Sequence, residues 1–303
     1  MAGLVWLVGS KGMLGTEVEA LLQEKKIPHV ATDLDCDITD PEAVLAYAGP
    51  KQIDWILNCS AYTAVDRAED EPVLAFKVNA DGPENLARLA KQKAARIIHI
   101  STDYVFDGKK DGAYTEEDKV NPIGVYGKSK AEGERRVRDA CARHFIVRTS
   151  WLFGPNGKNF VYTMLRLFNE KPVVRVVNDQ HGCPTYAPDL AAMLVKIVEL
   201  DSQEYGTYHF TNEGKTTWYE FAREIYRQAR DRGLVTSECR IEPITAAEYP
   251  TRAVRPRNSV LDTGKTRNTF LVSQPGWDVR IETCTRKNFR SRGAENASAR
   301  EVL

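Results

Sequence analysis

The stretch LVWLVGSKGMLGTEVEALL, residues 4–22, decides the fold. It opens with an apolar run as long as a buried strand, and this run ends at Gly9. After a short turn, apolar side chains recur at helical spacing: Leu14, Val18, Leu21 and Leu22. The pattern predicts a strand that passes through a tight, glycine-rich turn into an amphipathic helix.

Three glycines shape this turn as G-x-x-G-x-x-G: Gly9, Gly12 and Gly15. Without Cβ atoms in the way, the backbone N–H groups at the start of the helix can face a pyrophosphate. Three glycines alone can also mark no more than a flexible turn. The next β-rich run, 29–33, ends in Asp33, the expected position of an acid that binds an adenosine ribose. Together these features predict a dinucleotide site, with Met13 and Leu14 on its helical side.

The alternation of strands and helices continues along the chain. Further β-rich runs lie at 55–60, 96–102 and 145–154, with helical patterns at 71–93 and 129–143 between them. Strands joined by helices of this length form βαβ units and a parallel sheet that is covered on both faces. The predicted fold is therefore an α/β, Rossmann-type doubly wound parallel sheet.

Beyond about Gly154 the rhythm changes to turns, short strands and helices, which predicts a smaller, mixed C-terminal substrate domain. The last stretch of the chain has little apolar periodicity. We expect the chain to divide as follows: residues 1–153 and 186–212 in the dinucleotide-binding Rossmann domain, 154–185 and 213–285 in the substrate domain, and 286–303 in a frayed tail.

Composition excludes several classes of function. Lys plus Arg equals Asp plus Glu at 42 each, so no global field favours nucleic acid or an anionic membrane. Six scattered cysteines without a C-x-x-C pair fit neither a disulfide framework nor a zinc site. The apolar N-terminal run is too short for a signal peptide or a membrane span. We therefore expect a cytoplasmic protein with no nucleic-acid or membrane partner.

A tyrosine and a lysine stand four residues apart in VYGKSK, residues 125–130. Tyr126 and Lys130 could be the exposed start of an amphipathic helix, or a phenol whose proton is made available by a neighbouring ammonium. Spacing does not decide, because Tyr47 and Lys51 are also four apart. In that second pair an intervening Gly-Pro breaks the helix, so the two side chains are not expected to share a face.

Several longer motifs occur in order along the chain: NCSAYTAVDRAEDEP, STDYVFDG, VYGKSKAEGE, RTSW, NDQHGCPTYA, TTWYEFA and RPRNSVLD. With the glycine turn, they resemble the extended short-chain dehydrogenase/reductases and, more closely, the dTDP-4-dehydrorhamnose reductase family. The likeness runs from the first strand to about Asp262. It fades in the last stretch, where that family usually ends in an amphipathic helix.

The resemblance and the chemistry agree about the tyrosine. A free phenol has a pKa of about 10, and a nearby ammonium lowers it. Tyr126 is then the acid that protonates a carbonyl oxygen as hydride reaches its carbon, and Lys130 tunes it and holds the nicotinamide ribose. Thr102, in STD, is expected to donate a hydrogen bond to the same oxygen, or alternatively to cap the strand exit.

The implied cofactor is NADPH or NADH. Asp37 and Ile38 are expected to flank the adenine. The exit of the third strand is expected to line the cofactor channel with Ala61, Tyr62 and Thr63. The same stretch is also explained as a polar strand end. Asp33 would repel a 2′-phosphate and so favours NADH, whereas the resemblance implies NADPH. Lys11 is a cation in the turn that could reach a 2′-phosphate, so we expect both cofactors to be used.

The substrate side rests on weaker signals. Related dehydratases place Asp-Glu after the threonine, but here Asp103 is followed by Tyr104, which favours simple carbonyl reduction. Asp103 is expected to bind a sugar hydroxyl or to serve as a turn residue, and Trp151 to stack on the sugar or to pack between domains. Asn159 and Arg255 are expected to contact the nucleotide and its diphosphate, for which the arginine fork is suited.

The resemblance implies reduction of the 4-keto group of dTDP-4-dehydro-L-rhamnose to dTDP-L-rhamnose. Two alternatives stay open: another nucleotide-sugar 4-ketoreductase, and a non-catalytic regulatory subunit resembling the β subunit of methionine adenosyltransferase. Some family members bind magnesium at a dimer interface through glutamates. Only Glu17 has an obvious counterpart here, so we expect no metal, while a homodimer is compatible with the resemblance.

Overall fold

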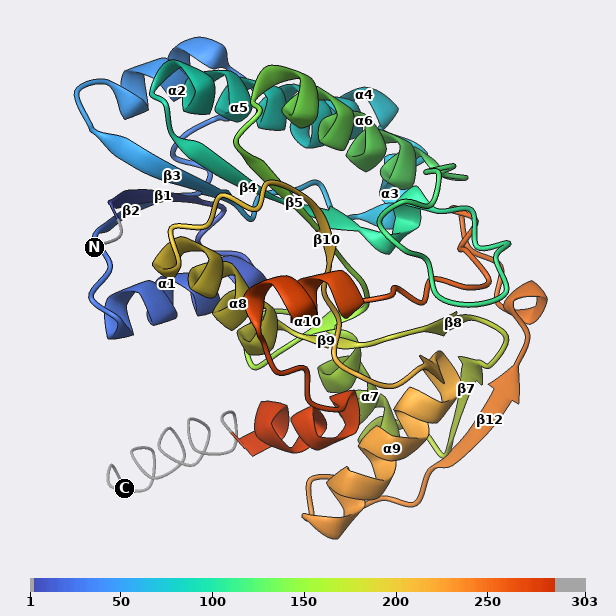
Figure 1. The fold of residues 1–303 in the computed structure, drawn as a ribbon. Helices are drawn as coiled ribbons and strands as arrows, with labels where there is room; N and C mark the ends of the chain where they lie inside the picture. Colours follow the sequence, from blue (N-terminus) through green and yellow to red (C-terminus); the bar gives the residue numbers. More distant parts are fainter. Residues whose placement is uncertain (1–2, 287–303) are drawn as a thin grey trace, which may run out of the picture.

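A six-stranded, all-parallel sheet forms the centre of the protein in the computed structural model, which describes residues 3–286 (Figure 1). The strand order is β10-β5-β4-β3-β1-β2. The strands have these bounds: β1 Leu4–Val8, β2 His29–Thr32, β3 Ile53–Asn58, β4 Arg96–Thr102, β5 His144–Thr149 and β10 Gly206–His209. The order reverses at β1, which is the usual place for a ligand crevice in an open α/β sheet.

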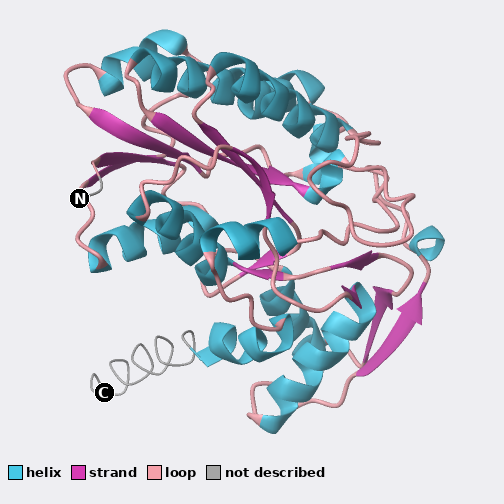
Figure 2. Ribbon diagram, in the orientation of Figure 1, coloured by secondary structure: helices cyan, strands magenta, loops and turns pink. Residues whose placement is uncertain are grey.

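Helices cover both faces of this sheet (Figure 2). On one face lie α2 Pro41–Ala48, α4 Pro72–Phe76, α5 Gly82–Gln92 and α6 Val125–Ala140, with the short α3 Val65–Ala68 near their end; on the other lie α1 Met13–Glu24, α8 Ala187–Glu199 and α10 Gly264–Phe270. Alternate side chains of β1 serve the two cores: Val5 and Leu7 join the α1/α8 side, and Trp6 and Val8 the α2/α5 side. The predicted doubly wound α/β fold is confirmed.

A second, smaller layer lies below the sheet and has a core of its own (Figure 2). Its main elements are α7 Phe160–Glu170, β7 Val173–Val177, α9 Trp218–Asp231 and β12 Arg240–Ile244, with β7 and β12 paired in parallel. Four two-residue strands connect it to the sheet: β6 Leu152–Phe153, β8 His181–Gly182, β9 Thr185–Tyr186 and β11 Thr216–Thr217. The sequence did not indicate β12 or α10. Residues 277–286 are helical, and the rest of the expected tail, 287–303, lies outside the described residues.

The helix expected at 71–93 contains a π-helical turn, Lys77–Asp81, between α4 and α5. Pro83 has no N–H to donate to the carbonyl of Asn79, and Gly82 donates instead to Lys77, five residues back. The strand expected at 145–154 was also wrong in its extent: it breaks after β5, where Trp151 takes a left-handed φ of 48°. Helix α6 starts at Val125, four residues before the predicted start, so Tyr126 lies in its first turn.

A buried ion pair holds α6 against the sheet. Glu134 of α6 accepts two hydrogen bonds from Arg148 of β5, at 2.8 and 2.7 Å, and a third from the hydroxyl of Ser101 at 2.6 Å. Burial by itself raises the pKa of Glu134, but the arginine and the serine hold it below its ordinary value of 4.5. This pair therefore stabilises the fold above that pH, and its contribution is lost as the pH falls through the lowered pKa.

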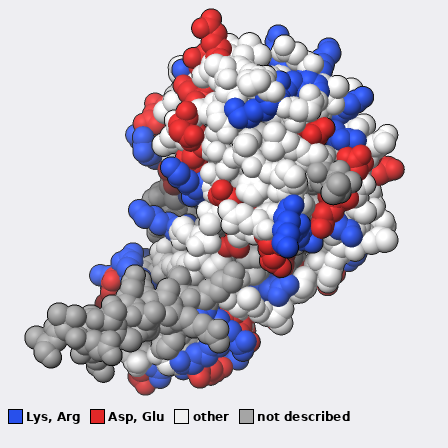
Figure 3. All heavy atoms as spheres, turned by 90° about the vertical axis from the view of Figure 1, so that its left-hand side faces the viewer, with Lys and Arg blue, Asp and Glu red and all other residues white. Residues whose placement is uncertain are grey.

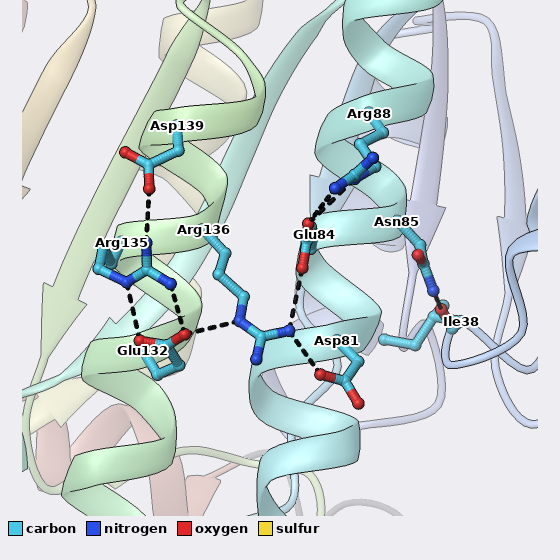
Figure 4. Close-up of polar contacts among 9 residues, drawn as sticks. All are labelled: Ile38, Asp81, Glu84, Asn85, Arg88, Glu132, Arg135, Arg136 and Asp139. Carbon is cyan, nitrogen blue, oxygen red and sulfur yellow. Dashed lines mark hydrogen bonds and ion pairs between the residues drawn. The ribbon is translucent and has the colours of Figure 1, made fainter.

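A second set of ion pairs joins α6 to α5 at the protein surface (Figure 4). Arg136 donates to Glu132 on its own helix, and reaches across to Asp81 and Glu84 at 2.6 and 2.9 Å. Arg135 and Arg88 extend the same network on the two helices. Positive and negative side chains are likewise interspersed on the face drawn in Figure 3.

We predict that Glu134→Gln lowers the free energy of unfolding at pH 7 by about 3–5 kcal/mol, because Arg148 is left buried without its counter-charge. The matched control is Glu132→Gln, two residues away on the same helix, whose partly exposed pairs at the surface should cost less, about 1 kcal/mol. Urea unfolding followed by circular dichroism measures both. Equal losses in the two variants would contradict a special role for the buried pair.

Candidate active site

The glycine turn between β1 and α1 is too tight for side chains at two of its positions. Gly9 has a φ of 78°, and a Cβ atom there would lie 2.7 Å from the backbone nitrogen of Ser60. At Gly15 a Cβ atom would lie 2.0 Å from the carbonyl oxygen of Gly9. Gly12 begins α1 without a side-chain cap, which leaves the first N–H groups of the helix for an anion. Leu14 points into the core, so only its backbone can face such a ligand.

Asp33, directly after β2, forms hydrogen bonds with the glycine turn. Its carboxylate accepts hydrogen bonds from the backbone N–H groups of Lys11 and Leu34, both at 3.0 Å. Asp37, four residues on, accepts from the hydroxyl and the N–H of Thr39, and this lowers its pKa. Asp33 thus supports the turn itself, whatever it contributes to an adenosine ribose.

Ile38 follows β2, and residues 61–63 follow β3; these are the strands on either side of β1. Ile38 is buried against Gly82, where a Cβ atom would lie 2.5 Å from its Cδ1 atom. After β3, the N–H of Tyr62 donates to Asn79 Oδ1 at 2.8 Å, and Asn79 Nδ2 donates to the carbonyl of Tyr62 at 3.1 Å and to the hydroxyl of Ser129 at 3.0 Å. The π-helical turn places Asn79 here, and so fixes the backbone of Ala61–Thr63.

Tyr126 lies in the first turn of α6, with its ring edge-on to Tyr104 at 5.5 Å between centroids. Burial raises the pKa of Tyr126 to about 12, the Thr102 hydroxyl lowers it, and Asp103 raises it. Thr102 Oγ1 donates to Asp103 Oδ1 at 2.9 Å and accepts from the N–H of Tyr104. The predicted phenol and hydroxyl are therefore neighbours at the carboxyl end of β4.

Lys130, one turn further along α6, is buried and reaches β4. Its Nζ donates to the carbonyl of Ile100 at 2.6 Å and lies 3.5 Å from His99 Nε2. Burial lowers the pKa of Lys130 to about 8, although Glu134 and Cys59 raise it. The expected lowering of the Tyr126 pKa by this lysine stays a prediction, since its ammonium is directed at His99 and Ile100.

Asp103 is buried beside these groups, at the start of a 3-10 turn, Asp103–Val105. Burial raises its pKa to about 6, while the hydroxyls of Ser259 and Thr102 lower it. A carboxyl group with such a pKa can act as acceptor or donor toward a sugar hydroxyl near neutral pH.

Three residues expected at the substrate have protein partners in the structure. Trp151 stacks on Trp218, with centroids 3.6 Å apart and planes at 10°. Asn159 caps α7: its Oδ1 accepts from the N–H of Tyr162, and its Nδ2 donates to a backbone carbonyl. Arg255 forms an ion pair with Asp66 at 2.9 Å. These contacts agree with the packing alternative for Trp151 and with a structural role for Asn159.

Sequence inspection missed two polar residues in the core of the site, His99 and Asn58. Each stands in an otherwise apolar strand, in RIIHIST and WILNCS, and both are fully buried. A single polar residue in a buried strand needs a partner inside the protein, and this was the signal available.

The second tyrosine–lysine pair, Tyr47 and Lys51, is in contact although it does not share a helix. Helix α2 ends at Ala48, and the Lys51 ammonium lies 4.2 Å from the ring centre of Tyr47.

Glu17, the single counterpart of the magnesium-binding glutamates, accepts a hydrogen bond from Asn156 at 2.8 Å. Within residues 3–286, no group of three or more His, Cys, Asp or Glu side chains is placed to hold a metal ion. None of the helices described there has the length and apolar character needed to cross a bilayer.

The chain is similar to known proteins along most of its length. The model of the RmlD substrate binding domain family matches residues 3–289. A dTDP-4-dehydrorhamnose reductase of Aggregatibacter actinomycetemcomitans is 41% identical over 291 residues, covering 94% of this chain and 97% of that protein. The enzyme of Escherichia coli K12 is 36% identical, covering 94% and 98%.

Solved structures agree with these relatives. The dTDP-4-dehydrorhamnose reductase of Bacillus anthracis, crystallised with NADP, superposes with a TM-score of 0.88 at 36% identity, covering 95% of this chain and 100% of that one. A dTDP-glucose 4,6-dehydratase of Streptomyces venezuelae, at 17% identity and a TM-score of 0.76, shares the fold alone. The resemblance predicted from the sequence motifs is confirmed: the chain belongs to the dTDP-4-dehydrorhamnose reductase family.

Proposed function

We propose that this protein reduces the 4-keto group of dTDP-4-dehydro-L-rhamnose to dTDP-L-rhamnose, with NADPH or NADH as hydride donor. The observation that carries the proposal is the grouping of Thr102, Tyr126 and Lys130 at the sheet edge that also bears the glycine turn. Membership of the reductase family supports the choice of substrate.

The side chains divide the work of a carbonyl reduction. The reduced nicotinamide supplies the hydride when bound. Tyr126 donates its phenolic proton to the carbonyl oxygen, and the Thr102 hydroxyl, once its proton turns from Asp103, donates a hydrogen bond to that oxygen. Lys130 holds the nicotinamide ribose, and the glycine turn offers the N–H groups of α1 to the pyrophosphate. Asp103 fits a sugar hydroxyl.

The ligand is a dTDP-sugar, the location is the cytoplasm, and the chain acts as a homodimer. The glycine turn and the exits of β2 and β3 form the cofactor side, and the layer around α7 and α9 forms the sugar-nucleotide side, with residues 154–185 and 213–285 as its extent. A non-catalytic regulatory subunit would bind nicotinamide but show no turnover of the keto sugar.

We predict that Tyr126→Phe lowers kcat by about 10²–10⁴-fold, the usual contribution of general acid catalysis. Cofactor affinity and thermal stability should stay close to those of the wild type, because the ring and its contact with Tyr104 remain. Turnover of dTDP-4-dehydro-L-rhamnose, followed as NADPH oxidation, measures the loss. Wild-type rates in the variant would overturn the assignment of the acid, and no turnover in either protein would overturn the proposed function.

Trp151→Ala is expected to raise KM for the sugar nucleotide roughly 2- to 10-fold, as loss of an aromatic contact does, with nicotinamide binding nearly unchanged. Trp218→Ala is the matched control, since it removes the other half of the same stack. If both variants lose stability equally and neither changes KM, Trp151 acts in packing alone.

Asp33→Asn should raise the ratio of kcat/KM for NADPH to that for NADH, by roughly fivefold or more. Removing the carboxylate relieves a repulsion worth about 1 kcal/mol at 4 Å even in water. The amide oxygen can still accept from the N–H of Lys11 and so keep the turn intact. Lys11→Ala should move the ratio in the opposite direction. An unchanged ratio in both variants would show that Asp33 does not face the ribose.

A further inference from the structure

A chain of buried polar groups runs behind Lys130, away from the crevice. Lys130, His99 and Asn58 are 2%, 0% and 0% exposed. Lys130 Nζ lies 3.5 Å from His99 Nε2, and His99 Nδ1 lies 3.1 Å from Asn58 Nδ2. Buried groups of this kind must satisfy each other, because water does not reach them.

The amide of Asn58 has a single orientation that fits its neighbours. Its Oδ1 accepts from the backbone N–H of Ser60 at 3.0 Å and from the Ser60 hydroxyl at 2.6 Å. A backbone N–H can only donate, so the group facing Ser60 must be the oxygen. The NH₂ group of Asn58 therefore faces His99.

This orientation decides the tautomer of His99. Its Nδ1 accepts the proton of the Asn58 amide, and burial holds the pKa of His99 well below 6.5, so the ring is neutral. The single ring proton is then on Nε2. Three other histidines have the opposite arrangement, because each directs Nδ1 at a backbone carbonyl: His29, His144 and His209.

The Nε2–H of His99 meets Lys130, and two donors cannot share a hydrogen bond. While Lys130 is an ammonium, the contact at 3.5 Å is between two donors; once Lys130 is a neutral amine, it accepts from Nε2–H. The other groups around the amine are the Ile100 carbonyl, Cys59 and Glu134. Glu134 is paired with Arg148 and still raises the pKa of Lys130, against the effect of burial.

We propose that His99 is a positioning residue of this site: its Nε2–H, oriented by Asn58, fixes the place of the Lys130 amine and favours the neutral amine over the ammonium. Burial acts in the same direction and brings the pKa of Lys130 to about 8. Lys130 can then exchange its proton close to neutral pH instead of being a permanent cation. The consequence for catalysis rests on the proposed function; the tautomer and the titration do not.

Nitrogen-15 NMR of the full-length chain, labelled at histidine and lysine, tests the first part without any turnover. We expect His99 as the Nε2–H tautomer between pH 6 and 9, opposite to His144 and His209, with its signal assigned by loss in His99→Phe. Lys130 should titrate near pH 8, assigned with Lys130→Met. An Nδ1–H tautomer at His99 would overturn the proposal.

Two variants test the effect on Lys130. Asn58→Asp presents an acceptor to His99 Nδ1, which should move the ring proton to Nδ1 and raise the Lys130 titration by about one pH unit or more, as the loss of one ordinary hydrogen bond would. His99→Phe should raise it as well. Because the new carboxylate also acts on Lys130 directly, Asn58→Asp is repeated in His99→Phe, where its additional shift should be smaller. If Asn58→Asp shifts the Lys130 titration equally in the wild type and in His99→Phe, then His99 does not transmit the effect of residue 58 to Lys130.

The pH profile of kcat gives the readout in the working enzyme. We expect the alkaline limb of this profile to follow the deprotonation of Lys130, and to move to higher pH by a similar amount in His99→Phe. The control is His144→Phe, which removes a histidine bound to the carbonyl of Cys141 and should leave the limb unchanged. If the Lys130 titration shifts in His99→Phe but the alkaline limb of the kcat profile does not, the proposed effect of His99 on catalysis is wrong. Absence of turnover in the wild type would instead reject the proposed function and leave the NMR result standing.

Discussion

The seating of α6 on the sheet is the constraint on which the site depends. The helix approaches its neighbours too closely for side chains at two positions: a Cβ atom would lie 2.2 Å from the carbonyl oxygen of Tyr104 at Gly127, and 2.0 Å from that of Asn79 at Gly133. Directly after Gly133, Glu134 is joined to Arg148 of the sheet. Because Tyr126 and Lys130 are carried by this helix, their positions follow from its contact with β4 and the π-helical turn.

Burial governs the electrostatics of the site more than charge pairing does. It raises the pKa of Tyr126 to about 12 and that of Asp103 to about 6, and it lowers that of Lys130 to about 8. All three shifts favour the uncharged form, as removal from water requires. Asp103 and Lys130 can therefore exchange protons near neutral pH, whereas Tyr126 stays protonated there. The Thr102 hydroxyl donates a hydrogen bond to Asp103, and Lys130 donates one to the carbonyl of Ile100.

The cofactor side and the sugar side of the proposed site differ in whether their side chains already have partners within the protein. On the cofactor side the glycine turn offers backbone N–H groups, and Asp33 supports that turn from behind. On the sugar side Trp151 and Arg255 are already bound to Trp218 and Asp66. Side chains with such partners are held in one orientation before a ligand arrives, which favours binding if they face it and restricts them to packing if they do not.

The sequence by itself determined the sheet, the glycine turn and the Tyr126/Lys130 pair, because periodicity, glycine spacing and i, i+4 neighbours are local properties of the chain. The tertiary structure decided what local spacing cannot express. The π turn at Asn79 arises from Pro83 together with the close approach of α6, and the break at Trp151 from stacking on Trp218, 67 positions away in the chain. Lys130 points to His99 because β3, β4 and α6 pack together. Buried donors and acceptors on these elements are shielded from water, so they form hydrogen bonds with one another.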